Sequence, residues 1–133
     1  MDIKKILIVI VLILFLDFSW LYFNFANYNK TVQKIQNEPI KIYILPAILC
    51  YILVIISIVF FAIPLITYYI TVEKYTKWLA CILFGGGLGF IIYGVYNLTT
   101  LAIIKNHNWL ITAMDMLWGF SLYSIATLVY FYI

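Results

Sequence analysis

Long apolar stretches alternate with short polar segments along the whole chain. A helix needs about 20 consecutive, mostly apolar residues to cross the hydrocarbon core of a bilayer. Four stretches meet this length, and they predict membrane-spanning helices over about 6–23, 43–70, 78–104 and 109–132. Only helices and closed barrels satisfy every backbone hydrogen bond in lipid. The pattern therefore predicts an all-α fold, an integral-membrane four-helix bundle in which residues 1–133 form a single transmembrane domain.

Two prolines interrupt the second stretch. Pro46 suits the first turn of a helix, where its missing N–H breaks no hydrogen bond. Pro64 lies further inside, so we expect it either to end the helix or to kink it. Between the first two stretches, residues 24–41 are polar and form the longest expected loop.

The composition also indicates a membrane protein. Hydrophobic residues make up 67% of the 133 residues and charged residues only 10%, whereas soluble domains carry about 25% charged residues. The net charge of +3 rests on eight lysines without any arginine, which is too sparse for the clustered basic patch of a nucleic-acid-binding protein. We therefore expect a multi-pass protein that lies in the lipid bilayer and has no nucleic-acid partner.

The lysine positions leave the orientation undetermined. We call side A the membrane face that carries the N-terminus and the second connection, and side B the face that carries the first and third connections. Each side has four lysines: Lys4, Lys5, Lys74 and Lys77 on side A, and Lys30, Lys34, Lys41 and Lys105 on side B. Because the positive-inside rule needs an excess on one side, it favours neither orientation.

Two aspartates, Asp17 and Asp115, lie inside apolar stretches. A carboxylate in hydrocarbon is costly, and intramembrane acids usually mark functional sites. Asp17 is about six residues from the side-B end of its span, and Asp115 follows Trp109, at the side-B start of the last span, by six residues. At about 1.5 Å per residue, we expect both acids about 9 Å below one interface, and Asn97 of the third span about 12 Å below it.

Helical spacing places an aromatic residue on the same helix face as each of these three polar residues. The pairs are three or four residues apart, which is the spacing of neighbours on one face. If the faces meet, they form a half-buried pocket that opens to side B. The candidate binding or coupling residues are Asp17, Trp20, Tyr93, Asn97, Asp115 and Trp118.

The expected chemistry of the pocket follows from its two acids. Burial disfavours a charged carboxylate, and two neighbouring carboxylates repel each other. We therefore expect the pair to hold at least one proton near neutral pH and to exchange a proton or a cation. The alternative interpretation is structural, with Asp17 and Asp115 acting only as hydrogen-bonding partners that hold the helices together.

Small residues indicate where helices approach closely. Gly85 and Gly89 have the Gly-x-x-x-Gly spacing of membrane helix contacts, and we expect Gly119 of the fourth span to be a packing residue as well. Four spans enclose only a narrow cavity, so we also expect a homodimer, with the glycine face of the third span as its candidate interface.

Three functions fit these residues. The first is a small transporter or channel-like protein, coupled to a proton, a cation or a small amphipathic ligand. The second is a membrane enzyme or binder that acts on a lipid-like molecule, with the acids as general acid and base. The sequence shows no group of His, Ser or Cys residues that would form a nucleophilic site. Catalytic residues therefore stay unassigned, and an enzyme is the less favoured interpretation. The third is a structural or accessory subunit. We expect no metal site and no cofactor.

The ordered motifs resemble those of a known family. Asp17-x-x-Trp20, Tyr96-Asn97-Leu98-Thr99 and Asp115-x-x-Trp118-Gly119 are similar to the landmarks of a family of small predicted membrane proteins of unknown function. Its members typically carry Tyr-Asp-Leu-Thr-Asn ahead of Asp-x-x-Trp-Gly, so Asn97 stands here in place of an aspartate and Thr100 in place of an asparagine. The resemblance spans nearly the whole chain and implies the same site, but it implies no substrate.

Overall fold

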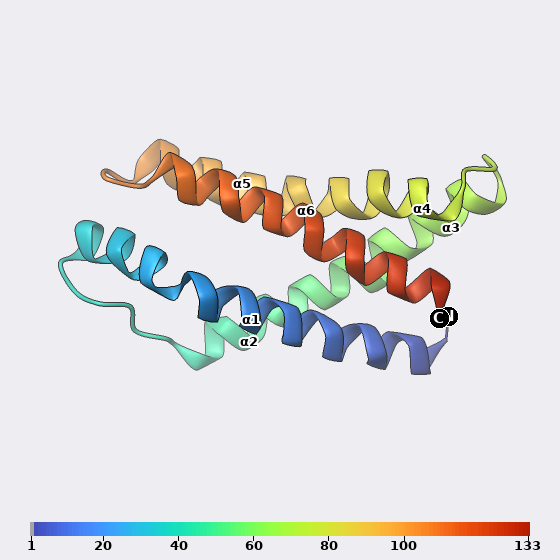
Figure 1. Ribbon diagram of the computed structural model, residues 1–133, viewed down its shortest axis with the longest axis horizontal. Coiled ribbons are helices and arrows are strands. Elements are labelled where there is room, and N and C mark those ends of the chain that lie inside the picture. The colour runs from blue at the N-terminus through green and yellow to red at the C-terminus, as the bar shows by residue number, and fades with distance from the viewer. Residues whose placement is uncertain (1) are drawn as a thin grey trace.

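Each of the four apolar stretches forms one helical rod in the computed structural model, which describes residues 2–133 (Figure 1). In chain order the rods are α1 (Ile3–Gln36); α2 (Ile44–Ser57), η1 (Ile58–Ala62) and α3 (Ile63–Thr71); α4 (Lys77–Ala80), η2 (Cys81–Gly86) and α5 (Gly87–Ile103); and α6 (Trp109–Tyr132). All four rods are long and apolar enough to span a membrane. The all-α prediction is confirmed, and the protein is a multi-pass integral membrane protein.

The first rod is much longer than its apolar stretch. The helix begins at the cap residue Asp2, whose side chain accepts a hydrogen bond from the backbone N–H of Lys4. It continues through the polar residues 24–36 and ends at Gln36, and the cap residue Asn37 that follows has a left-handed φ of 59°. The prediction of a loop from residue 24 onward was wrong, because this segment contains no Gly or Pro to stop a helix and Tyr28 hydrogen-bonds to α6.

Pro64 does not end the second rod. The π-helical turn η1 comes immediately before it, with the N–H of Ile63 bonded to the carbonyl of Ile58. A proline has no N–H for the helical ladder and its ring crowds the preceding turn, and a wider π turn is a common way to absorb such a break. A second π turn, η2, lies in the glycine-rich part of the third rod and contacts η1.

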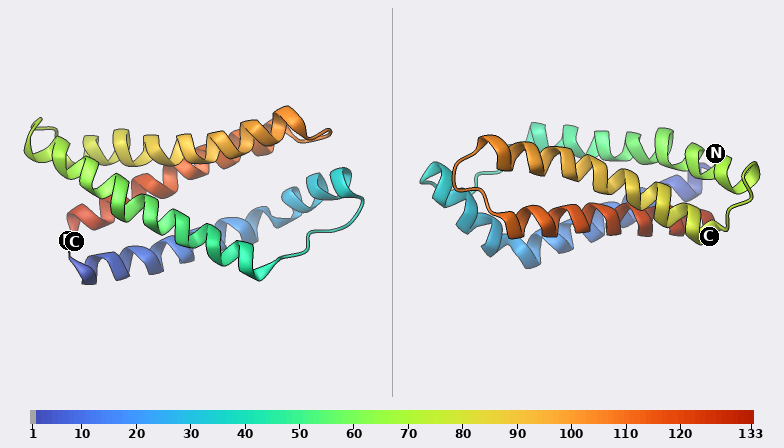
Figure 2. Two further views of the ribbon diagram at one scale, coloured as in Figure 1. Left: turned by 180° about the vertical axis from the view of Figure 1, so that it is seen from behind. Right: turned by 90° about the horizontal axis from the view of Figure 1, so that it is seen from above.

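The rods do not form an evenly packed bundle. Helices α5 and α6 run antiparallel in close contact, and α1 packs against α6 (Figure 1). The second rod meets the others toward side A, where α3 contacts α4 and η2, and α2 diverges from α5 toward side B (Figure 2). The buried core lies in the side-A half, around Val9, Ile58, Leu122 and Tyr123.

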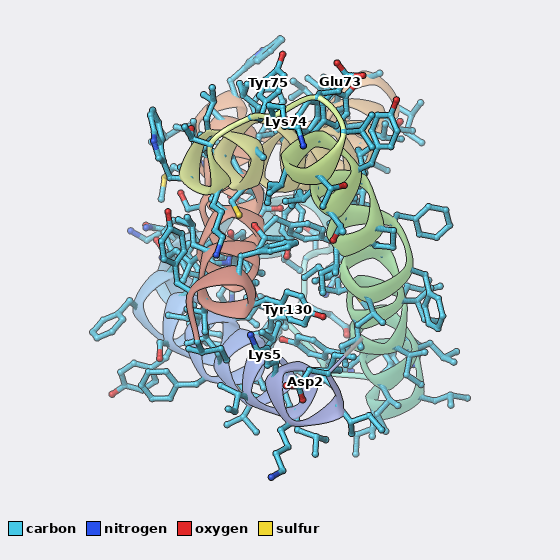
Figure 3. All side chains as sticks on the ribbon, turned by 90° about the vertical axis from the view of Figure 1, so that its right-hand side faces the viewer. Asp2, Lys5, Glu73, Lys74, Tyr75 and Tyr130 are labelled. Atoms are coloured by element: carbon cyan, nitrogen blue, oxygen red, sulfur yellow. The ribbon has the colours of Figure 1, made fainter. Side chains whose placement is uncertain are left out.

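Asp2 and Ile133, the ends of the described chain, both lie at side A, and Figure 3 views the bundle from that side. Charged residues surround its rim, among them Lys5 of α1 and Glu73 and Lys74 of the α3–α4 turn. The Lys5 ammonium lies 5.9 Å from the ring centroid of Tyr130 in α6. The charges at this end are therefore well separated from Asp17 and Asp115 in the middle of their helices.

Candidate functional site

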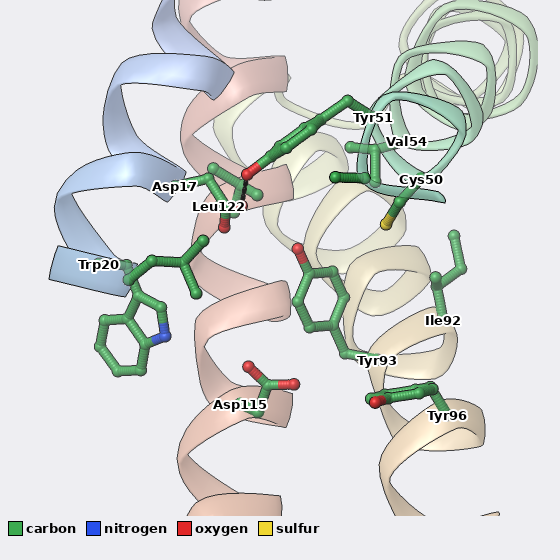
Figure 4. A pocket seen from close by; sticks show the side chains of 12 residues that line it. Asp17, Trp20, Cys50, Tyr51, Val54, Ile92, Tyr93, Tyr96, Asp115 and Leu122 are labelled. Carbon is green, nitrogen blue, oxygen red and sulfur yellow. Dashed lines mark hydrogen bonds between the residues drawn. The ribbon is translucent and has the colours of Figure 1, made fainter. Parts of the chain in front are cut away.

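Asp17 and Asp115 line one cavity of about 380 Å³ between α1, α2, α5 and α6 (Figure 4). The cavity exists because α2 diverges from α5 while α5, α6 and α1 stay together. Its wall is mostly apolar, with aromatic side chains from Trp20, Tyr51 and Tyr93. The two acids therefore line one shared cavity.

Asp17 accepts two hydrogen bonds from neutral donors. The Tyr51 hydroxyl of α2 donates to Oδ2 at 2.6 Å, and the indole Nε1–H of Trp118 in α6 donates to Oδ1 at 2.8 Å. The first bond is one of two side-chain hydrogen bonds that join α2 to other helices, and the second joins Ser57 to Tyr123 of α6. Asp17 thus connects three helices around the cavity.

Asp115 is held in the same manner by a different pair. The Tyr28 hydroxyl of α1 donates to Oδ1 at 2.8 Å, and the Asn97 amide of α5 donates to Oδ2 at 2.6 Å. The same Asn97 Nδ2 also donates to the backbone carbonyl of Tyr93 at 2.9 Å, one turn earlier in α5. Because its amide is fixed from both sides, Asn97 can act as an oriented donor to the carboxylate.

The two Asp-x-x-Trp motifs meet face to face on antiparallel helices. The indoles of Trp20 and Trp118 stack at a centroid distance of 4.6 Å with an interplanar angle of 3°. Trp118 donates directly to Asp17, whereas Trp20 donates to the Tyr28 hydroxyl at 3.1 Å, which in turn donates to Asp115. The result is an approximate two-fold arrangement around the stacked indoles.

This arrangement corrects the expectation that both acids lie at one depth. Each aspartate precedes its tryptophan by about one helical turn, and the helices run in opposite directions. When the tryptophans stack, the acids must lie on opposite sides of the stack. Figure 4 accordingly places Asp17 and Asp115 at different levels of the cavity, with the ring of Tyr93 between them.

The predicted glycine residues lie at the contact between α5 and α6. A Cβ atom on Gly89 would collide with the backbone carbonyl of Gly119, and one on Gly119 would collide with the ring of Tyr93. Gly85 faces Thr127 of α6 in the same way. This face of the third rod is covered within the chain, which removes it as the interface of a homodimer; the homodimer itself stays a prediction.

Sequence reasoning missed the tyrosines that hold the acids. Tyr28 extends the spacing of Asp17, Trp20 and Asn24 by four residues, so a longer helix prediction would have found it. Tyr51 carries no comparable signal, because it is one of many aromatic residues in apolar stretches and its partner is 34 residues away. Cys50 and Tyr96, which line the cavity beside them, were also not predicted.

No cationic side chain pairs with either acid in the part of the chain that the structure describes. The only ion pair among residues 2–133 joins Lys41 to Glu38 on the surface. Within the same range, no three His, Cys, Asp or Glu side chains gather closely enough to hold a metal ion. The site therefore combines two acids, neutral donors and aromatic walls, a combination suited to holding a proton or a cation.

Comparison with known proteins identifies one related group. A protein-family profile described as "Predicted membrane protein (DUF2177)" matches residues 2–132. No curated protein and no solved structure shows significant similarity to the chain. The match covers nearly the whole chain and is consistent with the family resemblance of its Asp-x-x-Trp motifs.

Proposed function

The chain belongs to this family of predicted membrane proteins, and we propose that it is a small membrane carrier in which Asp17 and Asp115 exchange protons for a cation. The alternative of an accessory subunit requires no exchangeable charge in the cavity, and the alternative of a membrane enzyme would use the acids as general acid and base without moving a proton across the membrane. The proposal rests mainly on the charge of the site, and the shape of the cavity supports it.

The uncompensated charge of the two acids carries the proposal. All four partners of the carboxylates, Tyr28, Tyr51, Asn97 and Trp118, are neutral donors. Neutral donors stabilise a carboxylate, but they do not cancel its charge, and isolated charges in an apolar medium are very costly. At least one proton or one bound cation is therefore needed to balance the pair, and either can be exchanged for the other.

The shape of the cavity is suited to a carrier. Toward side A it ends at Val54 and Leu122, beyond which the buried Tyr123 hydrogen-bonds with Ser57 across α6 and α2. On the α5 wall, Tyr96 is 67% exposed, so the cavity is accessible there. The cavity is thus closed toward side A and open laterally beside α5, and a carrier needs a site of this kind that is not open to both membrane faces at once.

The test is proton movement in proteoliposomes that contain the full chain, followed with an enclosed pH-sensitive dye under an imposed pH gradient, with sodium ions, potassium ions or an organic ammonium ion supplied in turn as the exchanging cation on the opposite side. We expect Asp17→Asn and Asp115→Asn to reduce the flux to the level of empty liposomes. Glu73→Gln, which removes an acid of the α3–α4 turn outside the cavity, should leave it unchanged. Equal flux in the wild type and both cavity variants, or no flux in the wild type, would contradict the proposal.

A further inference from the structure

We infer that the cation bound in this cavity is a small organic ammonium, a primary amine on an apolar or aromatic body, which reaches the acids from the bilayer between α2 and α5. The inference rests on the proposed function for its biological meaning, because it names the class of compound that the carrier would exchange for protons. It rests on separate observations for its chemistry: the volume, the acceptor geometry, the aromatic wall and the position of the opening.

The volume favours an organic ligand over a metal ion. A cavity of about 380 Å³ falls within the range of about 300–1,000 Å³ that is typical of small-molecule sites. A hard cation such as Ca²⁺ prefers six to eight oxygen ligands at short distance. Here most of the wall is hydrocarbon, including Leu21, Val54 and Leu122, which would leave such an ion poorly coordinated.

The acceptor geometry matches an ammonium group. Each of the four carboxylate oxygens already accepts one hydrogen bond, which leaves each with spare acceptor capacity. The Tyr93 hydroxyl makes no hydrogen bond to any described residue, and its ring projects into the cavity between the two acids (Figure 4). A primary ammonium carries three donors, and either carboxylate, with its spare acceptor capacity, can accept from it, as can the Tyr93 hydroxyl.

The aromatic wall suits the rest of such a ligand. Trp20, Tyr51, Tyr93 and Tyr96 all line the cavity. Aromatic faces attract organic cations through the ring quadrupole and also pack against apolar groups. A neutral apolar compound would gain only the second of these interactions, and it would leave the charge of the acids unbalanced.

The opening faces the lipid. Cys50 of α2 and Tyr96 of α5 are exposed and belong to the two walls that diverge toward side B (Figure 2). Both lie in rods that are long and apolar enough to span the membrane. An amphipathic amine dissolved in the bilayer can therefore reach Asp17 and Asp115 sideways, without crossing the packed core toward side A.

Cys50 provides a native reporter for this inference. It lines the cavity and is exposed, whereas the other cysteine, Cys81, is buried. We would compare its labelling by a cationic methanethiosulfonate, the trimethylammonium-ethyl reagent, with labelling by the anionic sulfonato-ethyl reagent. Because clefts lined by one sign of charge raise counter-ion association rates, we expect the cationic reagent to react at least about tenfold faster, after correction for its reactivity with a free thiol.

Protection of Cys50 then identifies the ligand class. We expect 2-phenylethylamine to slow the labelling in a saturable manner, while the neutral 2-phenylethanol and sodium or potassium ions do not. Both the charge preference and the protection should disappear in Asp17→Asn and Asp115→Asn. Cys81 should stay unlabelled in every variant as a check on folding, and Cys50→Ala should abolish the signal.

Equal protection by the alcohol, or protection by inorganic cations without protection by the amine, would overturn the inference. The outcome is separable from that of the flux experiment. Proton flux without amine protection removes only the ligand class and leaves the carrier proposal standing. Amine protection without flux supports the ammonium site and removes the carrier role.

Discussion

The contact between α5 and α6 and the space between α2 and α5 are two opposite solutions to helix packing in one small chain. At the first, glycines allow the backbones to touch, so that Gly89 lies directly against the carbonyl of Gly119. At the second, the helices diverge and leave a cavity of about 380 Å³. Helix α5 takes part in both, with its glycine face toward α6 and other faces toward the cavity.

The two regions differ in how firmly they hold the residues of the site. Asn97 and Asp115 belong to the close-packed pair of helices, so their mutual orientation is fixed by backbone contact. Tyr51 belongs to α2, whose other side-chain hydrogen bond to another helix lies between one and two turns away at Ser57. We infer that α5 and α6 hold Asp115 in place, while α2 is the wall of the cavity that can move. The following substitutions test this difference between the two regions.

The largest effect is expected at the close contact. Gly89→Ala would place a methyl group against the Gly119 carbonyl and the Tyr123 ring, and a backbone neighbour cannot move aside as a flexible side chain can. Overpacking of this kind typically costs 1–3 kcal/mol, and we expect a loss of about 3 kcal/mol in the free energy of unfolding. Thermal unfolding in detergent, followed by circular dichroism, measures the change.

Gly87→Ala is the matched control in the same helix. A Cβ atom at this position meets no atom within 4 Å. Since alanine is the better helix former by about 1 kcal/mol, this variant should unfold at the same or a higher temperature. If both variants behave alike, the close contact between α5 and α6 does not determine stability, and the proposed division between the two regions is wrong.

The sequence predicted the close contact between α5 and α6 better than it predicted the cavity. The lengths of the apolar stretches predicted the four rods, and the Gly85-x-x-x-Gly89 spacing indicated a helix contact, because both depend on local composition. The partner of that contact could not be assigned, since small residues allow packing within a chain as well as between chains. The expected dimer interface turned out to be covered by α6.

The cavity depends on tertiary details that local patterns do not encode. Asp17, Trp20, Asp115 and Trp118 were recognisable from helical spacing, and the structure brings them together. Their offset in depth could not be predicted, because it follows from the stacking of two indoles on antiparallel helices. The divergence of α2 was equally hidden, since it follows from how the second rod, with its π turn before Pro64, packs against the others.

A smaller effect on stability, with a clear effect on access, is expected where α2 is tethered. Tyr51→Phe removes the hydroxyl that donates to Asp17, while Trp118 still donates to the same carboxylate. The loss of one such bond costs about 1 kcal/mol, which corresponds to about a fivefold shift in an equilibrium. If α2 is the mobile wall, the adjacent Cys50 should react several times faster with a thiol reagent, while the unfolding temperature falls by only a few degrees.

Tyr96→Phe serves as the control for this tether. Tyr96 also lines the cavity, but it is 67% exposed, and its hydroxyl makes no hydrogen bond to residues 2–133. Its removal should leave the labelling rate of Cys50 unchanged. If Cys50 is labelled at an equal or slower rate in Tyr51→Phe, the hydrogen bond from Tyr51 to Asp17 does not limit the movement of α2. This result would show that α2 is as firmly held as α5 and α6.

The smallest effect on stability should come from filling the cavity. Ala47 of α2 lines it one turn before Cys50, and Ala126 of α6 is completely buried in the core. We expect Ala126→Leu to cost 1–3 kcal/mol, as overpacking of a dense interior generally does, and Ala47→Leu to change the free energy of unfolding by at most about 0.5 kcal/mol. Thermal unfolding compares the two variants directly.

The new leucine at position 47 should nevertheless slow Cys50 labelling, because it occupies the space through which a ligand reaches the acids. Equal destabilisation by the two substitutions would mean that the cavity closes in solution and that α2 packs as tightly as the rest of the bundle.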